Sequence, residues 1–137
     1  ERNDATYRTP FPGGWAGDKV DAFAGVGLTT RQRNAQDFVR KLANWRKGQP
    51  VIHNGKMMHY GPQDNTWVYF RYNDDKKVLV AFNNNSKEKA LDVDRFREML
   101  SGVAGGTDAL TGKTYDLREK LTLPARAAIV LELDAPR

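Results

Sequence analysis

The side chains in this sequence that could carry chemistry are carboxylates, two histidines and aromatic rings, because the chain contains no cysteine. Disulfides and thiolate metal ligands are therefore excluded. His53 and His59 lie six positions apart and no third nitrogen or thiolate accompanies them, so we expect ordinary hydrogen-bonded histidines and no metal site. The pairs Asp64–Asn65 and Asp74–Asp75 lack the ligand alternation of a calcium-binding EF-hand loop, and turn formation explains them better.

Aromatic residues offer a different chemistry, because a ring can stack on the C–H face of a sugar. Trp67, Tyr69 and Arg71 alternate along one expected strand and would share its second face, where they could form an exposed sugar-binding platform. The alternative is that a preceding helix, residues 29–47, covers this face. We favour packing over ligand binding for these three side chains.

The net charge of +5 raises a further possibility, the binding of a polyanion such as nucleic acid. Residues 1–50 carry nine basic and five acidic side chains, whereas residues 51–137 carry thirteen and twelve. The excess therefore lies in the first part, mostly along one amphipathic helix, where such charges usually form a solvated face. We predict no nucleic-acid partner.

The elements that must position these side chains begin with a long loop. Residues 1–28 are rich in proline and glycine and show little periodicity. From Thr29 to Lys47 the pattern is helical: Thr29 and Gln32 form a capping box, and an apolar stripe recurs at helical spacing. The stripe contains Ala35, Phe38, Val39, Leu42 and Trp45. Arg46 falls within this stripe, and we expect it to find an ion-pair or hydrogen-bond partner.

After Pro50 the apolar period becomes two, which indicates strands. Residues 66–72 and 77–83 alternate and are joined by turn residues, so they predict a hairpin. A short strand around Leu91 and a brief helix capped by Asp94 follow, while Gly105–Gly106 is expected to be a turn. Later strands are predicted at 108–110, 120–123 and 127–133. The fold class is therefore mostly β, an antiparallel Greek-key sandwich preceded by a loop and one amphipathic helix.

Three segments resemble, in order and spacing, the C-terminal part of glycoside hydrolase family 13 enzymes. Residues 8–18, RTPFPGGWAGD, resemble the segment after the last strand of the catalytic barrel. Residues 42–55, LANWRKGQPVIHNG, resemble the last barrel helix and its exit into the C-terminal domain. Residues 108–113, DALTGK, and 121–131, LTLPARAAIVL, resemble that domain's closing strands. The match is nearest to the α-amylase, neopullulanase and cyclomaltodextrinase branch.

The resemblance implies that residues 1–50 are a remnant of a catalytic (β/α)8 barrel, its last loop and helix 29–47, and that residues 51–137 are a C-terminal β-sandwich domain. We interpret Glu1 as a cut within a longer gene product. The parent enzyme would hydrolyse α-glucosidic bonds of starch, maltodextrin or pullulan with retention. That reaction needs two carboxyl groups about 5 Å apart. In the family these lie on earlier barrel strands, so no catalytic residue is carried over to this chain.

The resemblance also leaves four candidate substrate-binding residues, Arg8, Phe11, Trp15 and Trp67. The first three lie in what would be the last loop at the carboxyl end of the barrel, where barrel enzymes build their sites. Phe11 and Trp15 could stack on glucose, but we favour the alternative that they anchor the loop to the barrel.

The partner that the resemblance implies is the barrel of the same parent chain, with α-glucan reached through the parent's active site. We expect no cofactor in this chain, although calcium is possible in the parent, and no membrane span, because no apolar run approaches ~20 residues. A helix built to pack on a barrel would expose its stripe, so self-association is expected. A periplasmic or extracellular location is slightly favoured over a cytoplasmic one. The rival hypothesis is a stand-alone α-glucan-binding module.

Overall fold

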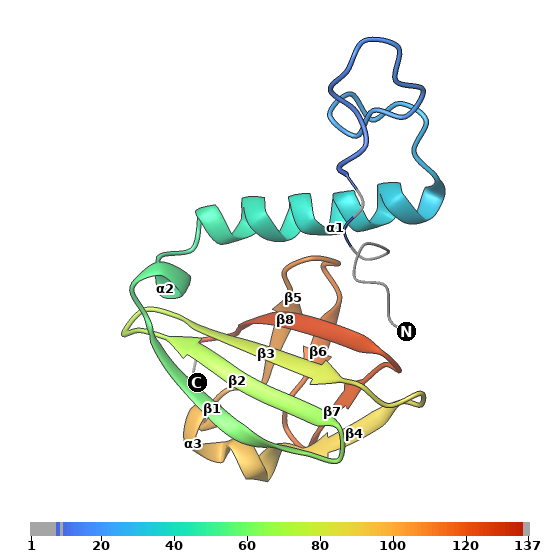
Figure 1. Ribbon diagram of the computed structural model, residues 1–137. Helices are drawn as coiled ribbons and strands as arrows, with labels where there is room; N and C mark the ends of the chain where they lie inside the picture. Colours follow the sequence, from blue (N-terminus) through green and yellow to red (C-terminus); the bar gives the residue numbers. More distant parts are fainter. Residues whose placement is uncertain (1–7, 9, 136–137) are drawn as a thin grey trace. The chain divides into compact units, whose positions relative to one another are not determined.

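The computed structural model describes residues 8 and 10–135 (Figure 1). The start at Glu1 and Thr9 of the first resemblance segment lie outside these described residues. The chain divides into two compact units, Glu1–Lys41 and Leu42–Arg137. The assignment of residues 1–50 to a barrel stays a prediction.

The described part of the first unit is a loop followed by most of helix α1, Thr30–Lys47. The loop is closed by an isolated antiparallel bridge between Asp21 and Val26. The Asp21 carboxylate accepts the backbone N–H of Phe23 at 2.8 Å. Gly13 has a φ of 105° and lies so close to Asp21 that an added Cβ would approach its Cα to 2.7 Å. Only glycine fits this position, because it combines a left-handed backbone with close approach.

Helix α1 begins with the predicted capping box, since Thr29 N–H donates to Gln32 Oε1 at 2.9 Å and Gln32 N–H donates to Thr29 Oγ1 at 3.3 Å. The expectation for Arg46 is wrong. Its side chain is exposed and has no hydrogen-bond or ion-pair partner among the described residues. Its carbonyl oxygen instead lies 2.9 Å from Nε2 of His53. A long flexible stem lets the guanidinium reach water even from a position beside the apolar stripe.

The second unit contains the antiparallel β-fold that the sequence predicts (Figure 1). Its six-stranded sheet has the order β1-β2-β3-β8-β5-β6, and a two-stranded sheet pairs β4 with β7. Because β8 lies between β3 and β5, the chain crosses over as a Greek-key connection requires. The strands are β1 Lys56–Gln63, β2 Thr66–Tyr72, β3 Lys77–Asn83, β4 Lys89–Asp92, β5 Gly105–Asp108, β6 Thr114–Asp116, β7 Lys120–Leu123 and β8 Ala127–Leu133.

Several local predictions are corrected by this unit. Gly105–Gly106 is not a turn but the start of β5, because both glycines approach neighbouring backbone too closely for a side chain. The cap of the brief helical segment, η2 Val93–Phe96 and α3 Arg97–Leu100, is Asp92 rather than Asp94: its carboxylate accepts the Asp94 N–H at 3.0 Å. Pro50 stops α1 but also begins a further short helix, α2 Pro50–His53.

The six-stranded sheet carries a buried cluster on each face. The larger cluster includes Phe70, Leu79, Phe96, Leu121 and Leu131 and fills the space between the sheet and the β4–β7, η2 and α3 layer. The smaller cluster lies on the opposite face, where Val51 of α2 and the last turns of α1 cover Val78, Val80 and Val130 of the sheet. Figure 1 shows α2 and α3 on opposite sides of the sheet. The second face is therefore covered by helix at one end only.

Candidate functional site

The loop of the first unit places Phe11 and Trp15 at its surface. Their exposed fractions are 63% and 83%, and Arg8 is also exposed. The Phe11 ring contacts Phe23 with ring centroids 5.0 Å apart, whereas the Trp15 side chain extends from a turn that Asp18 closes by accepting the Trp15 N–H at 2.9 Å. These two rings are accessible, as either a substrate contact or a barrel anchor would require.

Trp67, the fourth predicted residue, belongs to the second unit and lies in an aromatic platform, the name used from here for Trp67, Tyr69 and Phe82. In the β2–β3 register Trp67 lies opposite Phe82 and Tyr69 opposite Val80. The Trp67 and Phe82 rings are nearly parallel, at 15° with centroids 5.6 Å apart, and Tyr69 lies 5.1 Å from Trp67. Phe82 is 37% exposed, and the other two rings are half-buried.

Phe82 was missed as a partner of Trp67, although the predicted hairpin already implied it. A four-residue link between strands 66–72 and 77–83 pairs position 72 with 77, and by the same count 67 with 82. Cross-strand neighbours on one face stand about 5 Å apart, within reach of two rings. The register of the predicted hairpin therefore indicated that Trp67 and Phe82 are neighbours. Alternation along a single strand could not indicate this.

Arg71 shares the strand face of the platform but is committed elsewhere. Its terminal nitrogen donates to the carbonyl oxygens of Ile52 at 2.7 Å and Gly55 at 2.8 Å, which fixes the turn after α2 to the sheet. Its Nε is buried and has no hydrogen-bond partner among the residues that the structure describes. The contacts of Arg71 fit the favoured interpretation of packing rather than ligand binding. Trp67 and Tyr69 are half-buried, so packing accounts for only part of their surface.

A polar cluster beside the smaller core fastens the end of α1 to the sheet. Glu132 of β8 accepts hydrogen bonds from Trp45 Nε1 at 3.2 Å and Lys76 Nζ at 2.5 Å, and Lys76 also donates to Gln49 at 2.9 Å. Burial by itself would raise the pKa of Glu132, but the hydrogen bonds from Lys76 and Trp45 and the charge of Lys76 outweigh it. The pKa of Glu132 therefore lies below its usual value.

Neither carboxyl group with a clear pKa shift resembles a proton donor. The pKa of Asp116 is held at about 2 by hydrogen bonds from Arg118, and that of Glu132 is also lowered. A general acid of a glycosidase needs the opposite shift. Among the described residues no three histidine or acidic side chains gather as a metal site. Asp64 instead pairs with Lys89 at 3.0 Å.

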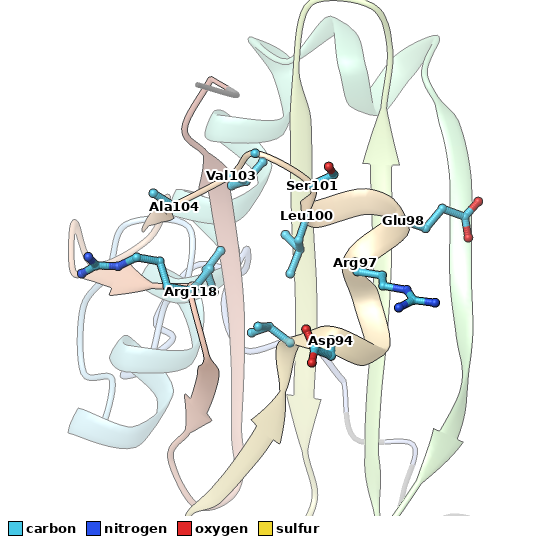
Figure 2. A pocket seen from close by; sticks show the side chains of 11 residues that line it. Asp94, Arg97, Glu98, Leu100, Ser101, Val103, Ala104 and Arg118 are labelled. Carbon is cyan, nitrogen blue, oxygen red and sulfur yellow. The ribbon is translucent and has the colours of Figure 1, made fainter.

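A hollow of about 590 Å³ lies between η2, α3 and the strand β6 region (Figure 2). Its floor is apolar, with Leu100 and Val103, and its rim carries charges of both signs. Figure 2 shows Glu98 and Arg118 extending to opposite sides, and Arg118 is already paired with Asp116. Charged side chains that point away from one another cannot bind one small ligand together. The aromatic platform is therefore the better candidate.

Comparison with known proteins locates the chain within one family. The family model described as the cyclo-malto-dextrinase C-terminal domain matches residues 57–132. An α-amylase structure from Anoxybacillus is 22% identical, with a TM-score of 0.63, and the match covers 91% of this chain. AmyP in complex with maltose is 17% identical, with a TM-score of 0.69 over 82% of this chain. At these identities the structures show the fold alone.

The same comparison shows how much of those proteins the chain represents. It covers 26% of the Anoxybacillus α-amylase and 23% of AmyP. The α-amylase of Geobacillus thermoleovorans, complexed with acarbose, is similar in the same way: 17% identity, a TM-score of 0.63, and 86% of this chain on 27% of that one. The chain thus spans about a quarter of the solved structures that it matches.

Proposed function

The chain belongs to the cyclo-malto-dextrinase C-terminal domain family, and from this premise we propose that it is the accessory domain of an α-glucan hydrolase. Its role would be to cover apolar surface of the catalytic barrel and to stabilise the barrel. The family membership supports the proposal that the chain is the C-terminal domain of such an enzyme. The chemistry would belong to the rest of the parent enzyme, whose substrates we propose to be starch-like α-glucans.

The observation that carries this proposal is the apolar stripe of α1, of which only one half packs against the sheet. Leu42 and Trp45 pack against the smaller buried cluster of the sheet. Phe38 and Val39, one turn earlier on the same stripe, are 48% and 62% exposed. Burying such side chains contributes roughly 1.5–3 kcal/mol each, so an unused half-stripe favours a further apolar partner.

The first unit supports the same conclusion. Of its described hydrophobic residues only Ala22 is buried, whereas Phe11, Trp15, Phe23 and Val26 are exposed. An apolar surface of this kind matches a segment that packs against a larger body. The barrel of the parent enzyme is the partner that we propose for it.

The first test is the mass of the native species that contains this sequence, detected in source cells with an antibody raised against the chain. A species several times larger than the chain's 15.5 kDa is expected, and its tryptic peptides should include those of an upstream barrel. A species of 15.5 kDa would overturn the proposal. Pre-immune serum and cells that lack the gene serve as controls.

The second test concerns catalysis. The purified chain should release no reducing sugar from starch, pullulan or maltodextrin, because the carboxyl pair of a retaining glycosidase is proposed to lie outside it. Turnover that co-purifies with the chain through two different chromatographic steps, and is absent from a mock preparation, would contradict the accessory role.

A further inference from the structure

Polar groups without a hydrogen-bond partner among the described residues lie on the aromatic platform and beside it. Trp67, Tyr69 and Phe82 contact one another, and His59 of β1 lies opposite Tyr69 in the strand register, on the same face. The indole N–H of Trp67, the hydroxyl of Tyr69 and the imidazole of His59 make no hydrogen bond with any described residue. Stacked rings beside unused donors are the composition of a carbohydrate-binding surface.

These polar atoms reach solvent. The buried side-chain atoms without a partner in the described part of the chain are Tyr60 Oη and Arg71 Nε, so the polar atoms of Trp67 and Tyr69 are not among them. His59 is exposed, and Phe82 presents more than a third of its surface. A ligand could therefore contact ring surface and hydrogen-bonding groups together without any rearrangement of the sheet.

The structure favours a sugar over two other classes of partner. An apolar protein surface laid on the platform would bury an N–H and an O–H without hydrogen bonds, at a cost of about 1–3 kcal/mol each. A polyanion would need basic side chains, yet the nearest one on β2, Arg71, is occupied by the carbonyl oxygens of Ile52 and Gly55. Sugar hydroxyls both donate and accept hydrogen bonds, so they satisfy all three polar groups.

We propose that the aromatic platform is a binding site for a linear α-glucan. The C–H faces of glucosyl units pack against Phe82 and Trp67, while sugar hydroxyls bond to the Trp67 indole, the Tyr69 hydroxyl and the His59 ring. The carbohydrate class follows from the platform itself. The choice of an α-glucan rests on the proposed function of the parent enzyme.

The experiment is a titration of the whole chain with maltoheptaose, followed by calorimetry and by NMR of the indole N–H groups, with cellohexaose as a β-linked control sugar. We expect saturable binding of maltoheptaose with a Kd on the order of 1 mM or lower. The perturbed indole signal should be that of Trp67, assigned by its loss in a Trp67→Phe variant. Cellohexaose should bind at least tenfold more weakly.

Three variants separate stacking from hydrogen bonding. Phe82→Ala removes an exposed ring and should weaken binding about tenfold. Trp67→Phe keeps a ring but removes the N–H, and His59→Ala removes the imidazole; each should weaken binding about 2–10-fold. Phe38→Ala, which removes a comparably exposed ring from α1, is the matched control and should leave the Kd unchanged. Unchanged circular dichroism and melting temperature verify that each variant is folded.

Flat titrations of the folded chain with maltoheptaose would overturn the proposal. So would binding that is lost in Phe38→Ala but kept in Phe82→Ala, because the sugar would then lie elsewhere. Equal affinity for cellohexaose would overturn the α-glucan assignment. None of these results touches the accessory role, which depends on the mass of the native species and on the reducing-sugar assay.

Discussion

The two units of this chain use their hydrophobic residues in opposite ways. Among the described residues of the second unit, nineteen hydrophobic side chains are buried, and of the large ones only Met57 and Phe82 are exposed. In the described part of the first unit Ala22 alone is buried, and six large hydrophobic residues are exposed. The six are Phe11, Trp15, Phe23, Val26, Phe38 and Val39.

This contrast shows that similar hydrophobicity can serve two different purposes. Side chains of the strands in the second unit alternate between the two faces of a sheet, so most of the apolar ones pack against another strand or a helix of the same unit. The described part of the first unit consists of most of α1 and a loop held by backbone bonds and by Asp21, and it contains no second layer on which the helix could pack. The exposed rings of the first unit are available to a partner. The aromatic rings of the second unit are packed within that unit, except at the aromatic platform.

The largest test of the contrast is the removal of a ring from each unit. Phe70→Ala, at a fully buried position, should lower the free energy of unfolding by about 3–5 kcal/mol in urea titrations. Phe23→Ala, at an exposed position of the first unit, should change it by less than about 0.5 kcal/mol. Similar losses for both variants would mean that the first unit has a core of its own and would break the comparison.

An intermediate effect is expected where α1 is fastened to the sheet. Glu132→Gln removes the charge that accepts hydrogen bonds from Lys76 and Trp45, and should cost about 1–2 kcal/mol at neutral pH. Trp45→Phe keeps an aromatic ring but loses the indole N–H and with it one of these bonds, and is the milder matched variant. Fluorescence-monitored urea unfolding measures both. A neutral result for both would show that the end of α1 is held by packing alone.

The same carboxyl group predicts the direction of a pH dependence. The pKa of Glu132 is lower in the folded protein than in the unfolded chain, so its contribution is fully present above the unfolded pKa. The contribution is lost as the pH falls through the folded pKa. The difference in melting temperature between the native sequence and Glu132→Gln should therefore shrink as the solution is acidified below about pH 4. A difference that stays constant to pH 2 would contradict this role.

The smallest effect concerns the start of α1. Thr29→Ala removes the capping box and should lower the local stability of the first helical turn by about 0.5–1 kcal/mol. Amide exchange should quicken at the first residues of α1, while exchange in β3 and β8 stays unchanged. Thr29→Ser, which keeps the hydroxyl, is the matched control. Faster exchange throughout the sheet would show that the two units unfold together, which would weaken the distinction between them.

Much of the second unit follows from local pattern. Alternating residues at 66–72 and 77–83 predicted β2 and β3 with their bounds, because period-two hydrophobicity and a turn leave few other arrangements. The strand β1 was not predicted: His59, Gly61 and Pro62 interrupt its pattern, and it exists because it pairs with β2. The local pattern of Gly105–Gly106 predicted a turn. In the structure both glycines lie in β5, where neighbouring backbone approaches too closely for any other residue.

By itself the sequence determined the capped helix and the central hairpin, since each depends on residues close together in the chain. It also determined the fold class and the family, since these depend on the types and order of segments along the chain. Only the tertiary structure decided which apolar residues are buried. Leu42 and Phe38 lie on one helical stripe. Leu42 is half-buried because it packs against the smaller cluster of the sheet, whereas Phe38 is exposed. The same holds for Trp45 and Glu132, which are 87 positions apart and joined by a hydrogen bond. Burial and long-range pairing depend on which elements meet, and the spacing along one element does not encode that.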